Sequence, residues 1–234
     1  MKTIMKSVLF PASAILLMAA APVWKSKQME QWSEQDAKLI LTASPWVSKI
    51  TPALLPERNE SQRRQGGSWG GGDGIGIEVF TPTTLIGVGT SSAAGKRGRR
   101  PTQVATLEIR WESAKAVRAA EEKAHEGDPP DVAAGNYVIA IYDVPGVDIN
   151  QKALSFQLKK DAFLKIEGKK NLRASRVDLL PQEGGLATIV FMFPRSADIT
   201  SEDMRVTFLA QMGRLSVAQY FYPREMTIQG KLEL

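Results

Sequence analysis

Apolar and polar residues alternate through much of the chain after position 104. Between 107 and 111, Leu, Ile and Trp alternate with Glu and Arg, which is the period of a strand with one buried face. Residues 137–144 are apolar at most positions, which indicates a strand buried on both faces inside a sheet. Further strands are predicted at 163–167, 175–180, 187–193, 205–210, 215–222 and 226–234.

The connections between these strands indicate how they pair. Residues 182–185 and 212–214 contain glycine and are short enough for hairpin turns. Helical patterns do not alternate with the strands, which argues against a parallel βαβ fold. We expect a mainly β (α+β) fold: an antiparallel β-sandwich or curled sheet of about seven strands, with one or two packed helices and a short N-terminal helix.

The N-terminal helix has a clear start and a clear end. Ser33 followed by Asp36 approximates a capping box. Ala37, Ile40 and Leu41 then form an apolar stripe at helical spacing. Ser-Pro at 44–45 ends the pattern, because a residue before proline disfavours the α conformation.

Two further segments have helical character. The segment 113–126 is rich in Ala and Glu and is followed by Asp-Pro-Pro, so we expect a helix with a thin apolar face. A short helix is expected around 151–160, although the pattern there is ambiguous.

The first residues have the three parts of a secretory signal peptide. Lys2 and Lys6 precede an apolar run over 8–21, which ends in three alanines. A helix of about 14 residues spans only about 21 Å, less than the ~30 Å hydrocarbon core of a membrane.

We assign residues 1–21 to the signal peptide, with Ala21 and Ala20 as alternative cleavage positions: a cut after Ala21 leaves Pro22 next in line, and a cut after Ala20 puts Met18 upstream. We expect a soluble mature protein, periplasmic or secreted, with no integral membrane span. The chain has no cysteine, so we do not expect a lipoprotein.

The mature chain divides into three parts by composition. Residues 22–56 form a helical segment that we expect to dock its tryptophans on the core. Residues 57–103 are rich in Gly and Arg, and we expect a flexible linker because they cannot bury enough apolar surface to offset their ordering entropy. Residues 104–234 form the β-rich domain.

Composition restricts the chemistry. Of 234 residues, 43% are hydrophobic and 24% charged, as in an ordinary globular protein. The absence of cysteine excludes disulfides and thiolate metal sites. The single histidine, His125, excludes multi-histidine zinc sites, and its place near the end of the 113–126 helix suits a structural role. We assign no catalytic residue, metal or cofactor.

A basic cluster is the first candidate binding site. Lys96, Arg97, Arg99 and Arg100 could bind anionic lipid, lipopolysaccharide or cell-wall polymer, or could simply form a solvated loop. No aromatic residue interleaves with them, as single-stranded nucleic-acid binding requires, and export removes the protein from most nucleic acid. We therefore expect no nucleic-acid partner.

Aromatic and acidic residues give the other candidates. Tryptophans 24, 32, 46 and 69 could line a groove, with Trp24 and Trp69 as candidate ligand contacts, but core packing is the ordinary role of such residues. Carboxylate pairs occur at 121–122, 128/131 and 202–203, without the spacing of a glycosidase or calcium site. In the helix, an ion pair of Arg118 with Glu122 at i, i+4 explains the acidic pair more simply.

Four segments carry a resemblance to other proteins. The chain resembles a group of uncharacterised exported bacterial proteins in Trp-Ser-Glu-Gln-Asp-Ala … Ile-Leu … Ser-Pro-Trp (32–46), Arg-Trp-Glu-Ser-Ala (110–114), Phe-Pro-Arg-Ser-Ala (193–197) and Gln-Gly-Lys-Leu (229–232). The resemblance implies export and no particular activity.

Two functions remain open. The first is a non-enzymatic exported protein that binds a partner or has a structural role in the bacterial envelope, with an envelope protein or an anionic polymer as the candidate partner. The second is a hydrolase of envelope polysaccharide or another polymer that uses carboxylates which the sequence does not single out.

Overall fold

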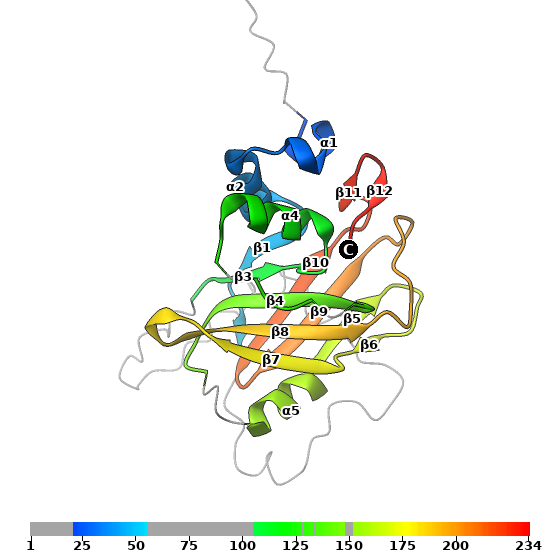
Figure 1. Cartoon of the computed structure of the whole chain (residues 1–234). Helices are drawn as coiled ribbons and strands as arrows, with labels where there is room; N and C mark the ends of the chain where they lie inside the picture. Colours follow the sequence, from blue (N-terminus) through cyan, green and yellow to red (C-terminus); the bar gives the residue numbers. More distant parts are fainter. Residues whose placement is uncertain (1–20, 56–104, 128, 133, 148–151) are drawn as a thin grey trace, which may run out of the picture.

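The computed structural model describes residues 21–55, 105–127, 129–132, 134–147 and 152–234 (Figure 1). The predicted linker at 57–103 and residues 1–20 of the predicted signal peptide lie outside the described residues.

Two five-stranded antiparallel sheets form the body of the protein. Sheet 1 has the order β1 (Val47–Ile50), β3 (Leu107–Arg110), β4 (Asn136–Pro145), β8 (Leu186–Pro194) and β7 (Arg176–Pro181). Sheet 2 has the order β2 (Ala53–Leu54), β10 (Leu215–Phe221), β9 (Val206–Met212), β5 (Ala162–Ile166) and β6 (Leu172–Arg173). The expected mainly β fold with antiparallel sheets and few helices is confirmed.

The two sheets are joined at both lateral edges. The chain passes from β1 in sheet 1 to β2 in sheet 2 across residues 51–52. It passes back from β6 in sheet 2 to β7 in sheet 1 across residues 174–175. Strands that switch sheets in this way form the corners of a sandwich and leave less unpaired strand edge.

An aromatic core lies between the sheets. Trp111, directly after β3, meets Phe221 of β10 edge to face with ring centroids 5.0 Å apart. Phe191 of β8 meets Phe208 of β9 in the same way at 5.3 Å. All four rings are fully buried. In each pair, one ring faces inward from sheet 1 and the other faces inward from sheet 2. This follows from the predicted alternation of apolar and polar residues along the strands.

The segment before β3 docks on this core. It comprises α1 (Val23–Ser26), the 3₁₀ turn η1 (Met29–Gln31), α2 (Glu34–Ala43) and the strands β1 and β2. The capping box is confirmed, because Asp36 N–H donates to Ser33 Oγ at 3.1 Å and Ser33 N–H donates to Asp36 Oδ2 at 2.9 Å. The predicted apolar stripe of α2 is fully buried. The hydrophobic pattern did not predict β1 and β2, which are short.

Removal of the cap should cost stability. We expect Ser33→Ala to lower the free energy of unfolding by about 1 kcal/mol, because the N–H of Asp36 loses its acceptor. Urea unfolding of the variant measures this. Ser26→Ala, an exposed serine that does not cap a helix through its side chain, is the control. An equal effect of the two substitutions would contradict the role of the cap.

The two other predicted helices are confirmed with shorter ends. α4 (Lys115–Ala124) packs against α2 above sheet 1, and α5 (Lys152–Lys160) lies against β7 (Figure 1). The turn between β7 and β8 includes a second 3₁₀ turn, η4 (Glu183–Gly185). Gly213 and Arg214 form the two-residue turn between β9 and β10. Both predicted hairpin connections are therefore present.

The closing segment differs from its prediction. Instead of one strand over 226–234 it forms a hairpin of β11 (Thr227–Ile228) and β12 (Lys231–Leu232). Gln229 and Gly230 have φ of 49° and 78°, as the central residues of a type I′ turn require. The alternation of apolar and polar residues over 226–234 wrongly indicated one strand, because a two-residue turn reverses the chain without interrupting that alternation.

The segment is nevertheless part of the packed structure. Met226 and Ile228 are buried, and Trp46 Nε1 donates to the carbonyl of Glu233 at 2.7 Å. Arg195 donates to the carbonyl of Leu234. These contacts tie the last residues to Trp46, directly before β1, and to the loop after β8.

The turn residue provides a test of the hairpin. We expect Gly230→Val to lower the free energy of unfolding by about 1–2 kcal/mol, because a β-branched residue disfavours positive φ. A Cβ at this position would have nothing within 4 Å, so a steric clash does not contribute. Gly230→Asn, which tolerates positive φ better, should cost less in the same unfolding experiment. Equal costs would argue against the type I′ turn.

Candidate functional site

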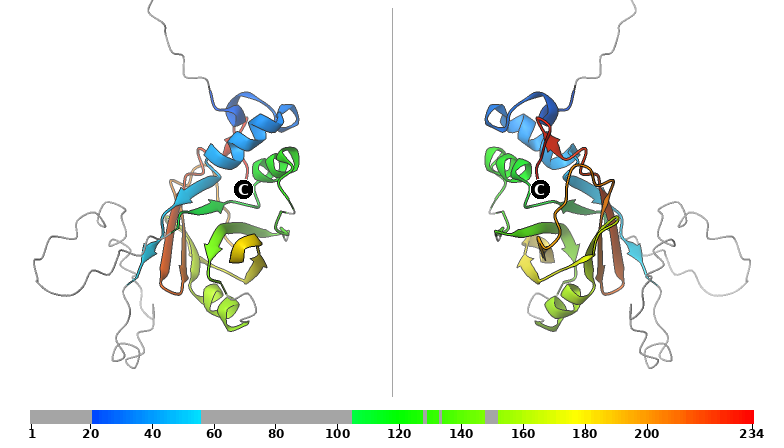
Figure 2. Two further views of the ribbon diagram at one scale, coloured as in Figure 1. Left: turned by 90° about the vertical axis from the view of Figure 1, so that its left-hand side faces the viewer. Right: turned by 90° about the vertical axis from the view of Figure 1, so that its right-hand side faces the viewer.

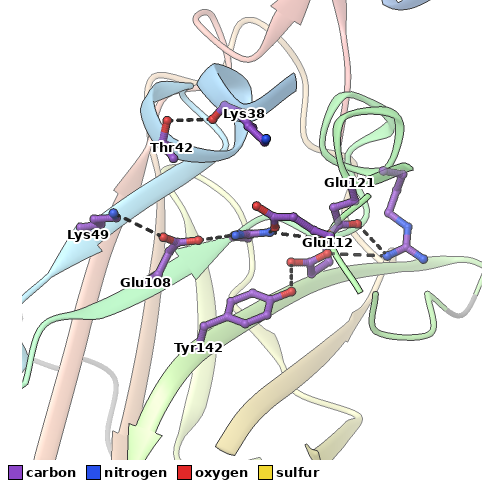
Figure 3. A network of polar contacts seen from close by, with 10 residues as sticks. Lys38, Thr42, Lys49, Glu108, Glu112, Glu121 and Tyr142 are labelled. Carbon is purple, nitrogen blue, oxygen red and sulfur yellow. Dashed lines mark hydrogen bonds and ion pairs between the residues drawn. The ribbon is translucent and has the colours of Figure 1, made fainter. Parts of the chain in front are cut away.

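A network of charged side chains lies on the outer face of sheet 1, beside α4 (Figure 3). Residues 107, 109 and 111 face the core, so the period of the strand places Glu108, Arg110 and Glu112 on the opposite face. The helix α4 adds Arg118 and Glu121. Tyr142 of β4 also belongs to the network.

Glu112 is the most deeply buried member. Its side chain is 0% exposed. The hydroxyl of Tyr142 donates to Glu112 Oε1 at 2.8 Å. Arg118 Nη1 lies 3.7 Å from Oε2, and within the described part of the chain no donor forms a hydrogen bond with this oxygen.

Glu121 shares the same guanidinium. Its side chain is 3% exposed, and its Oε2 lies 3.1 Å from Arg118 Nη1. Its other oxygen lies 3.7 Å from Arg110 Nη1. Two buried carboxyl groups therefore face one nitrogen of Arg118.

Arg110 connects this pair to further carboxylates. Its Nε lies 2.6 Å from Glu108 Oε1, and its Nη1 lies 2.7 Å from Glu126 Oε2. The guanidinium carbon lies 4.8 Å from the ring centroid of Tyr142. Lys49 of β1 reaches the second oxygen of Glu108 at 3.8 Å. The arrangement ties β1, β3, β4 and α4 together.

Burial sets the protonation of the network. Burial first, and the charge of Glu112 second, raise the pKa of Glu121 to about 8. Burial likewise raises the pKa of Glu112. It also raises the pKa of the Tyr142 hydroxyl, together with the charge of Glu112. Burial alone would lower the pKa of Arg110, but Glu108 and Glu126 outweigh it and raise that pKa. The carboxyl pair therefore retains a proton at neutral pH.

An open depression of about 670 Å³ reaches this network from solvent. Glu121 and Arg118 lie in its wall, whereas Glu112 does not. The other lining residues are Glu122, His125, Glu126, Gly127 and Pro129. Only one carboxyl of the buried pair is thus close to a surface that a ligand could reach.

The property of the network that matters for chemistry is the proton kept by the Glu112–Glu121 carboxyl pair. A buried carboxyl that keeps its proton at neutral pH could act as a general acid. In the described ranges no group of three or more His, Cys, Asp or Glu side chains could hold a metal ion. The carboxylates of the network are paired with Arg110 and Arg118.

The tryptophans that the structure describes pack in the core. Trp24, a candidate ligand contact, is half-buried and meets the buried ring of Trp46 edge to face at 6.3 Å. Trp32 is buried in the same cluster. These positions match the alternative of core packing. The second candidate contact, Trp69, lies outside the described residues, as do Lys96, Arg97, Arg99 and Arg100.

Other polar candidates have structural positions. His125 is the C-cap of α4 in the left-handed conformation, with φ of 54°. The predicted pair of Arg118 with Glu122 gives way to Glu121, because Glu121 faces the buried network while Glu122 faces solvent. Asp203 accepts from the N–H of Thr200 and from Lys169, both at 2.7 Å.

Sequence reasoning missed Glu112 and Tyr142. The alternation of Glu108, Arg110 and Glu112 was visible as a polar face of one strand. Nothing in the sequence indicates that this face is covered by α4, or that residue 142 pairs with residue 108 across the sheet. The partner of Glu112 is 30 positions away and is placed only by the strand register.

None of the helices in the described part is long and apolar enough to cross a membrane. No family model, no curated protein and no solved structure matches this chain.

Proposed function

We propose that this chain is an exported, non-enzymatic protein of the bacterial envelope that acts by binding a partner or by a structural role. The leading residues support export through their basic start, apolar run and small residues before position 22. The absence of cysteine is consistent with a protein that has no lipid anchor. The resemblance of residues 32–46 to a group of exported proteins points the same way.

The burial of the carboxyl pair is the observation that favours a non-enzymatic role. Glu112 is 0% and Glu121 3% exposed, and both face arginine. A polymer substrate must touch its general acid in the reaction. Buried carboxyl groups that are paired with arginine instead stabilise the packing of a helix on a sheet. We therefore interpret the network as a structural element that holds α4 on sheet 1.

A hydrolase is the second candidate, and one observation favours it. Glu121 lies in the wall of an open depression and its pKa is raised to about 8. A protonated carboxyl in a cleft is a typical general acid. In this alternative Glu121 protonates the leaving group of a polymer, and opening of the depression must first expose it.

Incubation of the purified mature protein with insoluble envelope material distinguishes the two. After sedimentation, the pellet is assayed for bound protein and the supernatant for new reducing ends and released peptides. The proposal predicts bound protein and no release of fragments. Glu121→Gln is run in parallel, with the exposed neighbour Glu122→Gln as its matched control.

Each outcome decides between the candidates. Release of fragments by the parent, lost in Glu121→Gln and retained in Glu122→Gln, would establish the hydrolase and overturn the proposal. Retention of all three proteins without release supports the binding function. A protein that neither binds nor releases fragments would refute both.

A further inference from the structure

The outer face of sheet 2 has an unusual side-chain composition. Two rows of cross-strand neighbours lie on this face. One row has the partly exposed apolar residues Phe163, Leu209 and Ala218; the next has Lys165 and Tyr220, both partly exposed, on either side of the buried Thr207. Their inward-facing neighbours form the buried core. Among the described helices, α2 and α4 pack beside sheet 1, and α5 packs mainly against β7 of sheet 1, with a smaller contact to β9 (Figure 2).

Within their strands, the residues of this face carry only positive charge. The strands of sheet 2 contain no Asp or Glu, whereas those of sheet 1 contain Glu108, Asp143 and Asp178. Lys165 lies in β5 and Arg173 in β6. The charge of this face therefore favours an anionic partner.

Two guanidiniums of this face lie on aromatic rings. The guanidinium carbon of Arg173 is 5.0 Å from the centroid of the Phe163 ring. That of Arg205, which precedes β9, is 5.0 Å from the centroid of the Tyr220 ring. Stacking restrains an arginine and leaves the edges of its planar group free to donate to carboxylate, sulfate or phosphate oxygens.

In the part of the chain that the structure describes, no ion pair joins the cations of this face to a carboxylate. In the described ranges no carboxylate lies within 4.0 Å of Lys165, Arg173 or Arg205. By contrast, Arg176 on the neighbouring sheet pairs with Asp178 at 2.8 Å. These three cations lie on β6, on β5 and next to β9, three adjacent strands with a width of about 10 Å at the usual strand spacing.

We propose that the outer face of sheet 2 binds an acidic polysaccharide, whose anionic groups contact Lys165, Arg173 and Arg205. The partly exposed Phe163, Leu209 and Tyr220 provide a flat apolar surface for the sugar rings between these contacts. A lipid surface fits less well, because Phe163, Leu209 and Tyr220 are only partly exposed and offer little apolar surface to insert into a bilayer. The inference rests on the proposed binding function and names its partner class and its surface.

Binding of soluble polysaccharides to the mature protein tests this. The probes are heparin, which carries sulfate and carboxylate, polygalacturonate, which carries carboxylate alone, and neutral dextran of similar length. The triple variant Lys165→Gln, Arg173→Gln, Arg205→Gln should bind both acidic probes about 10- to 100-fold more weakly than the parent at 0.15 M salt. Neutral dextran should not bind.

A control of equal charge separates this face from the general charge of the protein. The triple variant Lys38→Gln, Arg176→Gln, Lys231→Gln removes three exposed cations elsewhere, and it should lose less than threefold in affinity. Circular dichroism and melting confirm that both triple variants fold. The single variant Phe163→Leu keeps the charge but removes the ring on which Arg173 stacks, and it should bind the acidic probes more weakly than the parent.

Several results would overturn the inference. Equal weakening by the two triple variants would mean binding through net charge alone. Equal binding of dextran would exclude recognition of charge. Binding to vesicles of phosphatidylglycerol but to neither acidic polysaccharide would identify a lipid partner instead. If the parent and the Lys165/Arg173/Arg205 variant are retained equally on envelope material, the proposed function stands and the surface is wrong. Hydrolysis of that material would refute the function, whatever the face binds.

Discussion

Raising the pH from 5 to 8 is expected to lower the free energy of unfolding steeply. The pKa of Glu121 is about 8 in the folded protein, against an ordinary value of 4.5. Between these values the folded state binds more protons than the unfolded state, so stability falls as the pH rises and the loss is complete above about pH 8. One such group contributes up to about 1.4 kcal/mol per pH unit. The raised pKa of Glu112 acts in the same direction.

The groups around Glu121 account for this sign. Arg118 on the same helix and Arg110 on β3 favour its ionised form, but burial and the charge of Glu112 outweigh them. Asp36 has the opposite behaviour, because Lys27 first and the N–H of Ser33 second lower its pKa to about 2. Its stabilisation is present above its ordinary pKa of 3.8 and is lost only as the pH falls through 2, outside the range of the experiment.

Two variants assign the pH dependence. Urea unfolding at pH 5, 6, 7 and 8 should give a clearly shallower decline for Glu121→Gln, because the amide does not titrate. Glu122→Gln, one position along α4 and exposed, should follow the parent. If Glu121→Gln declines as steeply as the parent, the retained proton lies elsewhere.

Replacement of Arg110 by methionine is expected to lower the free energy of unfolding by about 3–5 kcal/mol at pH 7. The guanidinium lies within 4 Å of Glu108, Glu121 and Glu126, and its side chain is only 11% exposed. Methionine fills a similar volume but removes the cation that all three carboxylates share, so that among the described cations Glu121 keeps only Arg118 and Glu108 keeps only Lys49 at 3.8 Å. Chemical denaturation of the variant measures the loss.

Arg176→Met provides the comparison. Its guanidinium also pairs with a carboxylate, Asp178, at 2.8 Å, but its side chain is 63% exposed. An exposed pair contributes little, so we expect a change of less than about 1 kcal/mol. The cost of Arg110→Met should also shrink in acid, where the carboxylates become neutral. Equal costs for the two variants, or a cost that does not depend on pH, would contradict the importance of burial.

The sequence predicted helices and strands accurately where residues a few positions apart determine the element. The alternation at 107–111 became β3, and the capping box at Ser33 became the start of α2. The closing hairpin was misread, because a Gln-Gly turn at positive φ is compatible with an apparently continuous alternation. The strands β1 and β2 were missed because each is too short to show a period.

The sequence by itself determined which residues face the core and where the helices begin and end, because these depend on neighbours a few positions apart. Only the tertiary structure decided which polar residues meet. Tyr142 reaches Glu112 through the pairing of β3 with β4, and Arg118 reaches it through the packing of α4. Arg173 and Arg205 likewise share a face because β5 lies between β6 and β9. Strand order and register bring distant residues together. Which order and register are the most stable depends on contacts across the whole sandwich, which no short segment contains.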